Sequence, residues 1–160
     1  MATARTERDS ARKLVATNRK AFRDYEVLER IEAGLALRGT EVKALRGGDI
    51  SLTGAFAQVD GTQVLLQGLH ISPYRHGNRF NHDPTRARRL LLHRREIRRL
   101  IGQVAEKGRT LIPLRVYFRR GYAKVELGLC RGKHTSDKRE TLKRKTAERE
   151  ARRALSGARR

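Results

Sequence analysis

The chain has 160 residues, of which 38 are Lys or Arg and 17 are Asp or Glu, giving a formal net charge of +21. A compact domain with this excess repels itself unless a polyanion is bound, so the composition predicts a nucleic-acid-binding protein. Cys130 is the only cysteine, which excludes an intrachain disulfide and a cysteine-based zinc site.

The sequence shows no targeting or membrane segment. Its first ten residues contain no apolar signal region. No stretch approaches the ~20 consecutive apolar residues of a membrane span. We therefore expect a cytoplasmic protein without a membrane partner.

The first part of the chain predicts a polar end followed by a strand and a helix. Residues 1–17 are polar and are expected to be disordered, so the folded domain is predicted to span residues 18–130. Bulky and polar residues mix over 25–31, which favours a strand. Apolar residues at helical spacing predict a short helix over 40–46, with Thr40 as its N-cap and a Gly-Gly pair as its end.

Two hairpins follow from local turn chemistry. The first joins strands over 55–59 and 63–69 through Asp60-Gly61, a strong hairpin signal. The second joins alternating runs over 111–118 and 122–129 through an Arg-Arg-Gly turn.

Between the hairpins, an apolar stripe among seven arginines predicts a helix over 93–107, ended by Gly108. The elements together predict a mainly β fold with short helices. We expect a small antiparallel barrel, similar to an oligonucleotide-binding barrel, of about six strands with about three helices. Side chains fill the interior of so small a barrel, so a ligand would bind on its outer surface and loops.

The sequence offers no constellation for catalysis or metal binding. The Asp residues are scattered without a pair suited to metal-assisted phosphoryl chemistry, and no Walker-type phosphate loop is present. His76 and His82 share one loop and are best interpreted as solvated loop residues. We expect no enzyme activity, no cofactor, no metal site and no small-molecule substrate.

The arginine run carries +6 over fourteen residues with one glutamate included. Each arginine alone is compatible with a solvated helix face, but as a set they favour a surface that tracks phosphates. The run consists of Arg86, Arg88, Arg89, Arg94, Arg95, Arg98 and Arg99.

The last segment, residues 131–160, holds 12 basic and four acidic side chains. Leu142 and Leu155 are its only large aliphatic residues, too few for a stable isolated helix, so we expect the tail to be disordered when free. Two interpretations stay open: a solubilising end, or a basic segment that folds on RNA.

Several stretches, taken together, resemble the family of SsrA-binding proteins (SmpB). They are residues 18–20 (NRK), 32–46 (EAGLALRGTEVKALR), 83–92 (DPTRARRLLL), 96–97 (EI), 131–133 (RGK) and 137–139 (DKR). The resemblance runs from about residue 14 to 145 in matching order and spacing.

The resemblance implies a six-stranded oligonucleotide-binding barrel with three helices, in a bacterial protein. It implies a non-enzymatic adaptor that binds the tRNA-like domain of tmRNA (SsrA RNA) and enters stalled 70S ribosomes with it for trans-translation. The tail would enter the decoding centre and the empty mRNA channel, contact small-subunit rRNA there and fold as a helix. We expect a monomer.

Carried over by position, the family's RNA contacts fall on Asn18, Glu32, Leu91 and Lys124. Asn18 can donate and accept at a base edge or a 2′-hydroxyl, and Lys124 suits a phosphate. Glu32 can only accept hydrogen bonds, so it would favour amino groups of bases over phosphate; the alternative is a structural salt bridge to a nearby arginine. Leu91 could pack against an unstacked base, although the pattern alone would place it in the core. The other residues expected to bind tmRNA are basic: Arg19, Lys20, Arg86, Arg88 and Arg89.

In the tail, the segment matching the family's decoding-centre contacts comprises Gly132, Lys133, Asp137, Lys138 and Arg139. Many relatives carry His or Tyr, suited to stacking on a base, where this chain has Ser136. His134, two residues earlier, is a candidate substitute for that contact. Ala147 also stands where some relatives have a large aromatic residue.

Two other classes of function fit parts of the composition. A structural ribosomal protein is also small, basic and tailed, but it would co-sediment with ribosomes stoichiometrically. An RNA-processing enzyme would need a catalytic constellation that the sequence lacks.

Overall fold

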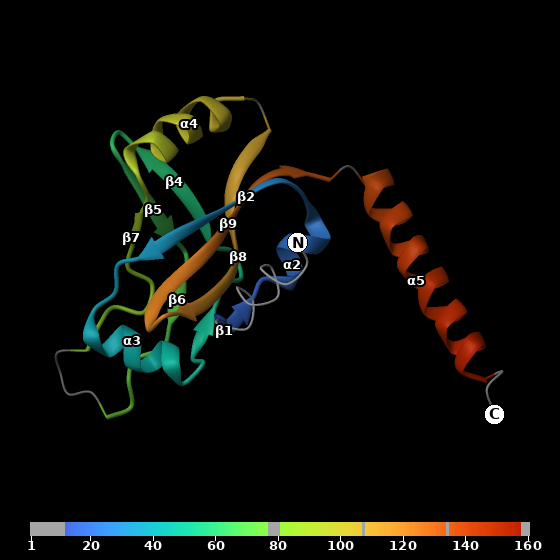
Figure 1. Cartoon of the computed structure of the whole chain (residues 1–160), viewed down its shortest axis with the longest axis horizontal. Helices are drawn as coiled ribbons and strands as arrows, with labels where there is room; N and C mark the ends of the chain where they lie inside the picture. The colour runs from blue at the N-terminus through green and yellow to red at the C-terminus, as the bar shows by residue number, and fades with distance from the viewer. Residues whose placement is uncertain (1–11, 77–80, 107, 134, 158–160) are drawn as a thin grey trace.

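A closed barrel dominates the computed structural model, which describes residues 12–76, 81–106, 108–133 and 135–157 (Figure 1). Hydrogen bonds run antiparallel around a ring of six strands, in the order β8, β4, β5, β7, β2, β9 and back to β8. This confirms the predicted mainly β barrel. The ring strands are β2 (Tyr25–Leu35), β4 (Phe56–Asp60), β5 (Gln63–Gln67), β7 (Arg88–Leu91), β8 (Arg109–Arg119) and β9 (Tyr122–Gly132).

Three further strands lie outside the ring. Strand β1 (Arg12–Thr17) pairs with β8, and β3 (Ile50–Ser51) pairs with β6 (His70–Ile71) as a short ribbon. Both predicted hairpins are present, β4–β5 and β8–β9. The β4–β5 turn falls on residues 61–62, one residue beyond the predicted pair. In the β8–β9 turn both central residues, Arg120 and Gly121, have positive φ, as a type I′ turn requires.

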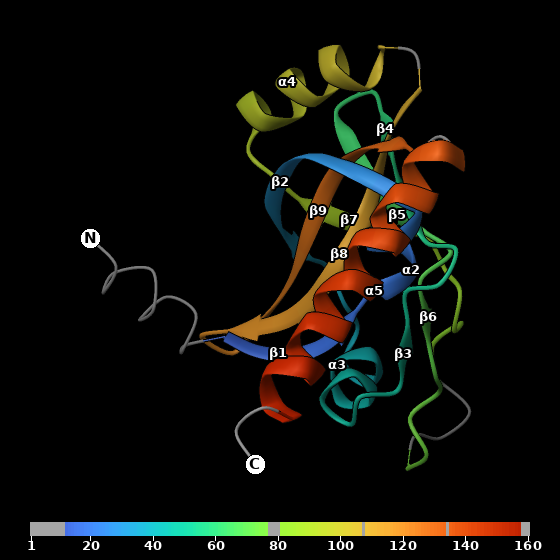
Figure 2. The ribbon, with the colours of Figure 1, turned by 90° about the vertical axis from the view of Figure 1, so that its right-hand side faces the viewer.

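Three helices surround the barrel, as expected. Helix α2 (Arg19–Asp24) leads into β2, α3 (Gly39–Arg46) lies at one end of the barrel, and α4 (Arg94–Val104) lies at the other (Figure 2). The barrel interior is filled by aliphatic side chains, including Leu66, Leu90 and Leu127. Each such leucine, fully buried, stabilises the fold by about 1.5–3 kcal/mol relative to an exposed one.

Two expectations at the N-terminal side are corrected. Residues 12–17, expected to be disordered, form β1, because they pair with an open edge of β8 and pack Val15 and Ala16 against the core. The folded domain therefore begins before residue 18; residues 1–11 lie outside the described part.

Thr40 does not cap α3, which begins after Arg38. The Glu41 carboxylate instead accepts from the Arg38 backbone N–H at 3.0 Å.

His82 is buried, not solvated as expected. Its Nε2 lies 2.9 Å from the carbonyl oxygen of Ile71, and its Nδ1 lies 2.9 Å from Thr40 Oγ1. Because a carbonyl can only accept, Nε2 is the ring nitrogen that donates to Ile71, while Nδ1 shares a hydrogen bond with the Thr40 hydroxyl. Cys130 is also buried, and burial raises the pKa of its thiol to about 11, so the thiol stays protonated at neutral pH.

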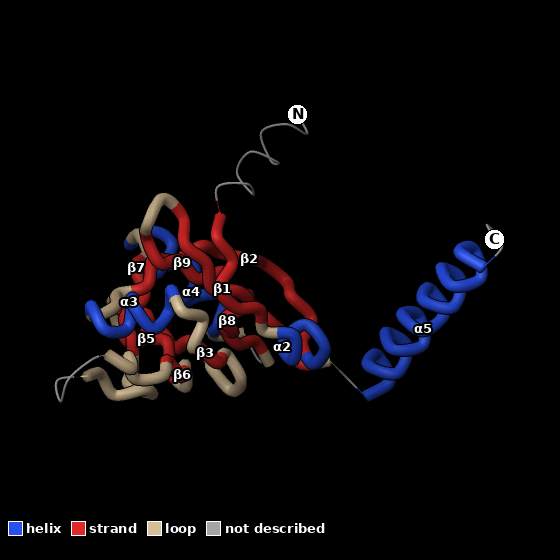
Figure 3. Tube along the Cα trace, turned by 90° about the horizontal axis from the view of Figure 1, so that it is seen from below, coloured by secondary structure: helices blue, strands red, loops and turns tan. Residues whose placement is uncertain are grey.

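The tail forms one helix, α5 (Thr135–Gly157), which stands apart from the barrel (Figure 1, Figure 3). This differs from the disorder expected for the free segment. No Gly or Pro interrupts residues 135–156, and Ala, Glu, Lys and Arg, which are good helix formers, predominate. Nearly all residues from 139 to 157 are exposed, so intrinsic propensity and not packing favours this helix.

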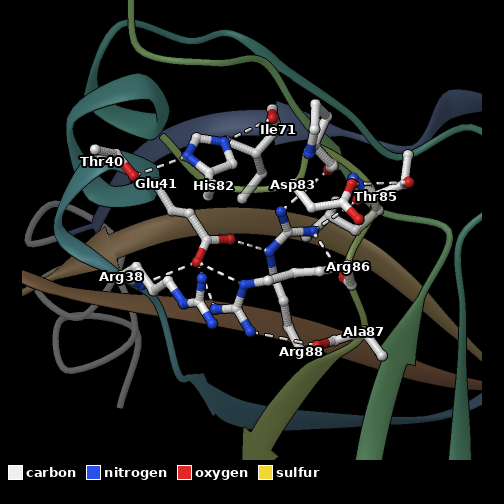
Figure 4. Close-up of polar contacts among 12 residues, drawn as sticks. Arg38, Thr40, Glu41, Ile71, His82, Asp83, Thr85, Arg86, Ala87 and Arg88 are labelled. Carbon is white, nitrogen blue, oxygen red and sulfur yellow. Dashed lines mark hydrogen bonds and ion pairs between the residues drawn. The ribbon is translucent and has the colours of Figure 1, made fainter. Parts of the chain in front are cut away.

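A buried ion pair joins α3 to β7 (Figure 4). Glu41 and Arg88 are both 0% exposed, and the Arg88 Nε donates to the Glu41 carboxylate. Arg88 also donates to the carbonyl oxygens of Leu69, at 2.7 Å, and Pro84, at 3.1 Å. Burial by itself raises the pKa of Glu41. Hydrogen bonds from Arg86, from the Arg38 backbone and from Arg88 outweigh burial and lower the pKa below its ordinary value.

Replacing Arg88 by Gln leaves the Glu41 charge buried and should lower the free energy of unfolding by about 3–5 kcal/mol, the cost typical of breaking a buried pair. The neighbouring Arg89→Gln variant should change it by less than about 0.5 kcal/mol, because Arg89 is exposed. Urea denaturation at neutral pH, followed by circular dichroism, measures both. Equal losses in the two variants would contradict the structural role of Arg88.

Candidate RNA-binding site

A hollow of about 640 Å³ opens between β2, β9 and the segment that runs from β7 into α4. Glu32, Leu91 and Lys124 all line it, so the fold brings together three residues that the sequence analysis selected from distant segments. His93 and Arg99 border the same hollow from the α4 side.

Strand register explains why these side chains meet. Gly34 of β2 pairs with Lys124 of β9 on one side and with Leu91 of β7 on the other. Glu32, two residues before Gly34, is on the same face of β2. A Cβ atom placed on Gly34 would lie 3.0 Å from the Leu91 Cβ, so a larger residue at this position would crowd Leu91. Leu91 is 53% exposed and is not a core residue.

Glu32 is held by neighbours on β8 and β1. Arg119 Nη1 donates to its carboxylate at 3.0 Å, the Tyr117 hydroxyl donates to the other carboxylate oxygen, and Arg12 Nη2 lies 3.6 Å away. Burial tends to raise the pKa of Glu32, but the Tyr117 hydrogen bond and the two arginines lower it overall. The salt bridge that the sequence left open for Glu32 is therefore present.

Asn18 has a structural role that the sequence analysis did not predict. It is only 7% exposed, and its side-chain N–H groups donate to the carbonyls of Pro113, at 3.0 Å, and Leu52, at 3.4 Å. Its side-chain oxygen accepts from the backbone N–H of Ala21 at 3.1 Å, which caps α2. Both donors are thus already used, which corrects the expected donation to an RNA base. Asn18 borders a second hollow, of about 410 Å³, together with Lys20; Arg19 and Lys20 are exposed.

The arginine run does not form one continuous surface. Arg88 is buried on β7, and Arg86 is mostly buried against Glu41, with its Nε 2.9 Å from the carboxylate. The buried Arg88 is therefore corrected from an RNA contact to a structural residue, whereas Arg86, whose side chain is 24% exposed, stays a predicted RNA contact. The sequence predicted no strand over β7, whose alternation places Arg88 inside and Arg89 outside. The members left exposed are Arg89, Arg94, Arg95, Arg98 and Arg99, the last paired with Glu29 at 2.6 Å.

The comparisons with known proteins agree with this architecture. The family model described as SmpB protein matches residues 15–157.

This chain belongs to the SmpB family.

Among its relatives, the SsrA-binding protein of Carboxydothermus hydrogenoformans is 53% identical over 143 residues, covering 89% of this chain and 96% of that protein. That of Geobacillus thermodenitrificans is 55% identical over 89% of this chain and 92% of its own length. A solved structure described as "tmRNA-SmpB: a journey to the center of the bacterial ribosome" matches with a TM-score of 0.65. It is 52% identical to this chain, with coverage of 79% of this chain and 93% of that one.

The root of the tail is fixed to α2. Gly132 ends β9, and the next residue, Lys133, donates its backbone N–H to the carbonyl of Asp24 at 3.1 Å. Lys133 Nζ also donates to the carbonyl of Phe22 at 3.4 Å. A cation at the C-terminal carbonyls of a helix interacts favourably with the helix dipole.

The remaining tail positions lie in or before α5. Asp137 and Lys138 belong to its first turn, Arg139 is exposed, and His134 lies outside the described residues.

Sequence reasoning missed Tyr117, Arg119 and Arg12 as partners of Glu32. Tyr117 and Arg119 are more than 80 residues from Glu32 along the chain, and Arg12 lies in the segment expected to be disordered. The one available signal was Tyr117 itself, because a tyrosine within an apolar strand usually finds a hydrogen-bond partner when buried.

Within the described ranges, no cluster of three His, Cys, Asp or Glu side chains is arranged to hold a metal ion. The described helices also include none that is long and apolar enough to cross a membrane.

The structural role of Asn18 can be tested without RNA. Asn18→Ala removes the α2 cap and two hydrogen bonds, so it should lower the free energy of unfolding of the free protein by about 1–2 kcal/mol. Arg19→Ala, at the adjacent exposed position, is the matched control and should stay within about 0.5 kcal/mol of the unmodified protein. Chemical denaturation measures both variants. An unchanged stability in Asn18→Ala would contradict this structural role.

Proposed function

We propose that this chain is a non-enzymatic RNA-binding adaptor. It binds the tRNA-like domain of tmRNA (SsrA RNA) and delivers tmRNA to stalled ribosomes for trans-translation, that is, ribosome rescue and peptide tagging. The observation that carries the proposal is the match to the SmpB family along almost the whole chain. The hollow that gathers Glu32, Leu91 and Lys124 also supports it.

The hollow combines three kinds of RNA contact. Lys124 supplies a cation for a phosphate, Leu91 supplies an exposed apolar surface for an unstacked base, and Glu32 supplies a hydrogen-bond acceptor. Arg89 and the exposed arginines at the start of α4 extend the positive charge beside it. Phosphate contacts provide affinity that falls with salt, whereas the other two contacts favour a particular RNA shape.

The tail provides the second RNA-binding surface of the proposal. Helix α5 leaves the barrel at Lys133 and carries basic side chains with little apolar surface, which suits a groove lined by rRNA phosphates. We assign it to the decoding centre and the empty mRNA channel of the 70S ribosome, where it contacts small-subunit rRNA. The residues assigned to this contact are Gly132, Lys133, His134, Asp137, Lys138 and Arg139.

We also propose that the protein is cytoplasmic and acts as a monomer. One barrel and one tail within a single chain supply both RNA-binding surfaces, so the mechanism needs no second copy. Size-exclusion chromatography of the purified protein tests the oligomeric state.

Preference for tmRNA is the first test. Filter binding at physiological salt should show that tmRNA binds at least tenfold more tightly than an unrelated structured RNA of equal length. Raising the salt should weaken both interactions, because both include phosphate contacts. Equal affinities for the two RNAs would contradict the proposed function. Stoichiometric, salt-resistant co-sedimentation with ribosomes would instead favour a structural ribosomal protein.

Removal of the tail is the second test. A variant that ends at Lys133 keeps the anchor on α2 and the entire barrel, so tmRNA affinity should change by less than about threefold. Tagging of a stalled product in a reconstituted translation reaction should be lost, because no segment reaches the decoding centre. Full-rate tagging by this truncated variant would refute the role assigned to the tail.

A further inference from the structure

Glu32 poses an electrostatic problem in a hollow proposed to hold RNA. A free carboxylate repels phosphates, and this one lies on the binding face of a chain with a net charge of +21. The side chain is only 30% exposed, yet it lines the hollow beside Lys124 and Leu91. Its neighbours should therefore explain how the position is compatible with an RNA ligand.

Two arginines neutralise the carboxylate. Arg119 donates to one oxygen at 3.0 Å, and Arg12 lies 3.6 Å from the other. Both are partly buried, with about a third of each side chain exposed, so solvent screens these ion pairs less than it screens a fully exposed pair. The Glu32 position thus presents hydrogen-bond acceptors without a net negative charge.

Tyr117 sets the orientation of the carboxylate. Its ring is buried on β8, its hydroxyl donates to the Glu32 oxygen that faces Arg12, and the Arg12 guanidinium lies over the ring, 4.9 Å from its centroid. A carboxylate offers about four lone-pair positions. The hydrogen bonds from Tyr117 and Arg119 occupy one on each oxygen, which leaves acceptor capacity for a ligand.

We propose that Tyr117, Arg119 and Arg12 are positioning residues that make Glu32 a neutralised hydrogen-bond acceptor for a donor group of the bound RNA. The donor is an exocyclic amino group of a base or a ribose 2′-hydroxyl, because phosphates carry no donor. This inference deepens the proposed function and rests on it. This contact lets the protein distinguish one particular RNA site from polyanions in general. It should add affinity without adding salt dependence.

The experiment measures binding of the full chain to the tRNA-like domain of tmRNA at several salt concentrations. Glu32→Gln and Tyr117→Phe should each weaken binding on the order of tenfold, as expected for a hydrogen bond to a charged group. Tyr117→Phe removes no charge, so it should leave the slope of log Kd against log salt unchanged. Lys124→Met should instead reduce that slope by about one unit. Tyr122→Phe, at the exposed first residue of β9, is the matched control and should bind like the unmodified protein.

A double-mutant cycle separates positioning from general stability. In the Glu32→Gln background, Tyr117→Phe should cause less than a twofold further loss, because the hydroxyl acts only through Glu32. Thermal unfolding of each variant by circular dichroism verifies that the barrel is intact. If Tyr117→Phe lowers the melting temperature but leaves Kd unchanged, or if the two losses multiply fully, the inference is overturned.

Nucleotide-analogue interference distinguishes the two possible donors. At random positions the RNA carries either 2′-deoxynucleotides or base analogues that lack the exocyclic amino group: inosine for guanosine, purine riboside for adenosine and pyrimidin-2-one riboside for cytidine. One position should weaken binding to the unmodified protein but not to Glu32→Gln. Interference by an amino-deleted analogue identifies an amino donor and interference by 2′-deoxy identifies a hydroxyl, while the absence of any such position overturns the inference. Failure of the unmodified protein to bind the tRNA-like domain would instead refute the proposed function itself.

Discussion

The buried pair of Glu41 and Arg88 is the interaction on which the arrangement of the barrel depends. It ties α3 to β7, and the same guanidinium satisfies backbone carbonyls on two further segments. Two desolvated charges are costly, and only the hydrogen bonds that surround them offset that cost. The pair therefore stabilises one position of β7 and disfavours others. That position closes the ring between β5 and β2 and places Leu91 over Gly34 at the hollow.

The same constraint divides the positive charge into structural and exposed parts. Because side chains alternate along a strand, fixing Arg88 inside places Arg89 outside. A run of arginines that looks uniform along the sequence thus contains residues that hold the fold together and residues available to RNA. The exposed members and Lys124 border the hollow or lie close to it, where their charge can attract phosphates.

A second fixed point lies at α2. Asn18 caps this helix and fastens it to β8, while Lys133 holds the root of the tail at the other end of the helix. The barrel and the root of α5 are connected through a single short helix, so the point from which the tail leaves is defined by the fold. Asn18 and Lys133, which resemblance alone would interpret as RNA contacts, also form this connection.

Sequence alone predicts the strand pairs of both hairpins, helix α4 and the family. These features depend on turn residues, on local apolar periodicity and on motifs that are contiguous along the chain. Tertiary structure alone decided that β1 is a strand, that Arg88 is buried, that Asn18 is a cap and that Glu32 is neutralised by Arg119. Each of these depends on partners distant in sequence or on which face of a strand points inward. Period-two alternation reveals that a strand has two faces, but only packing against the rest of the barrel determines which face is inside.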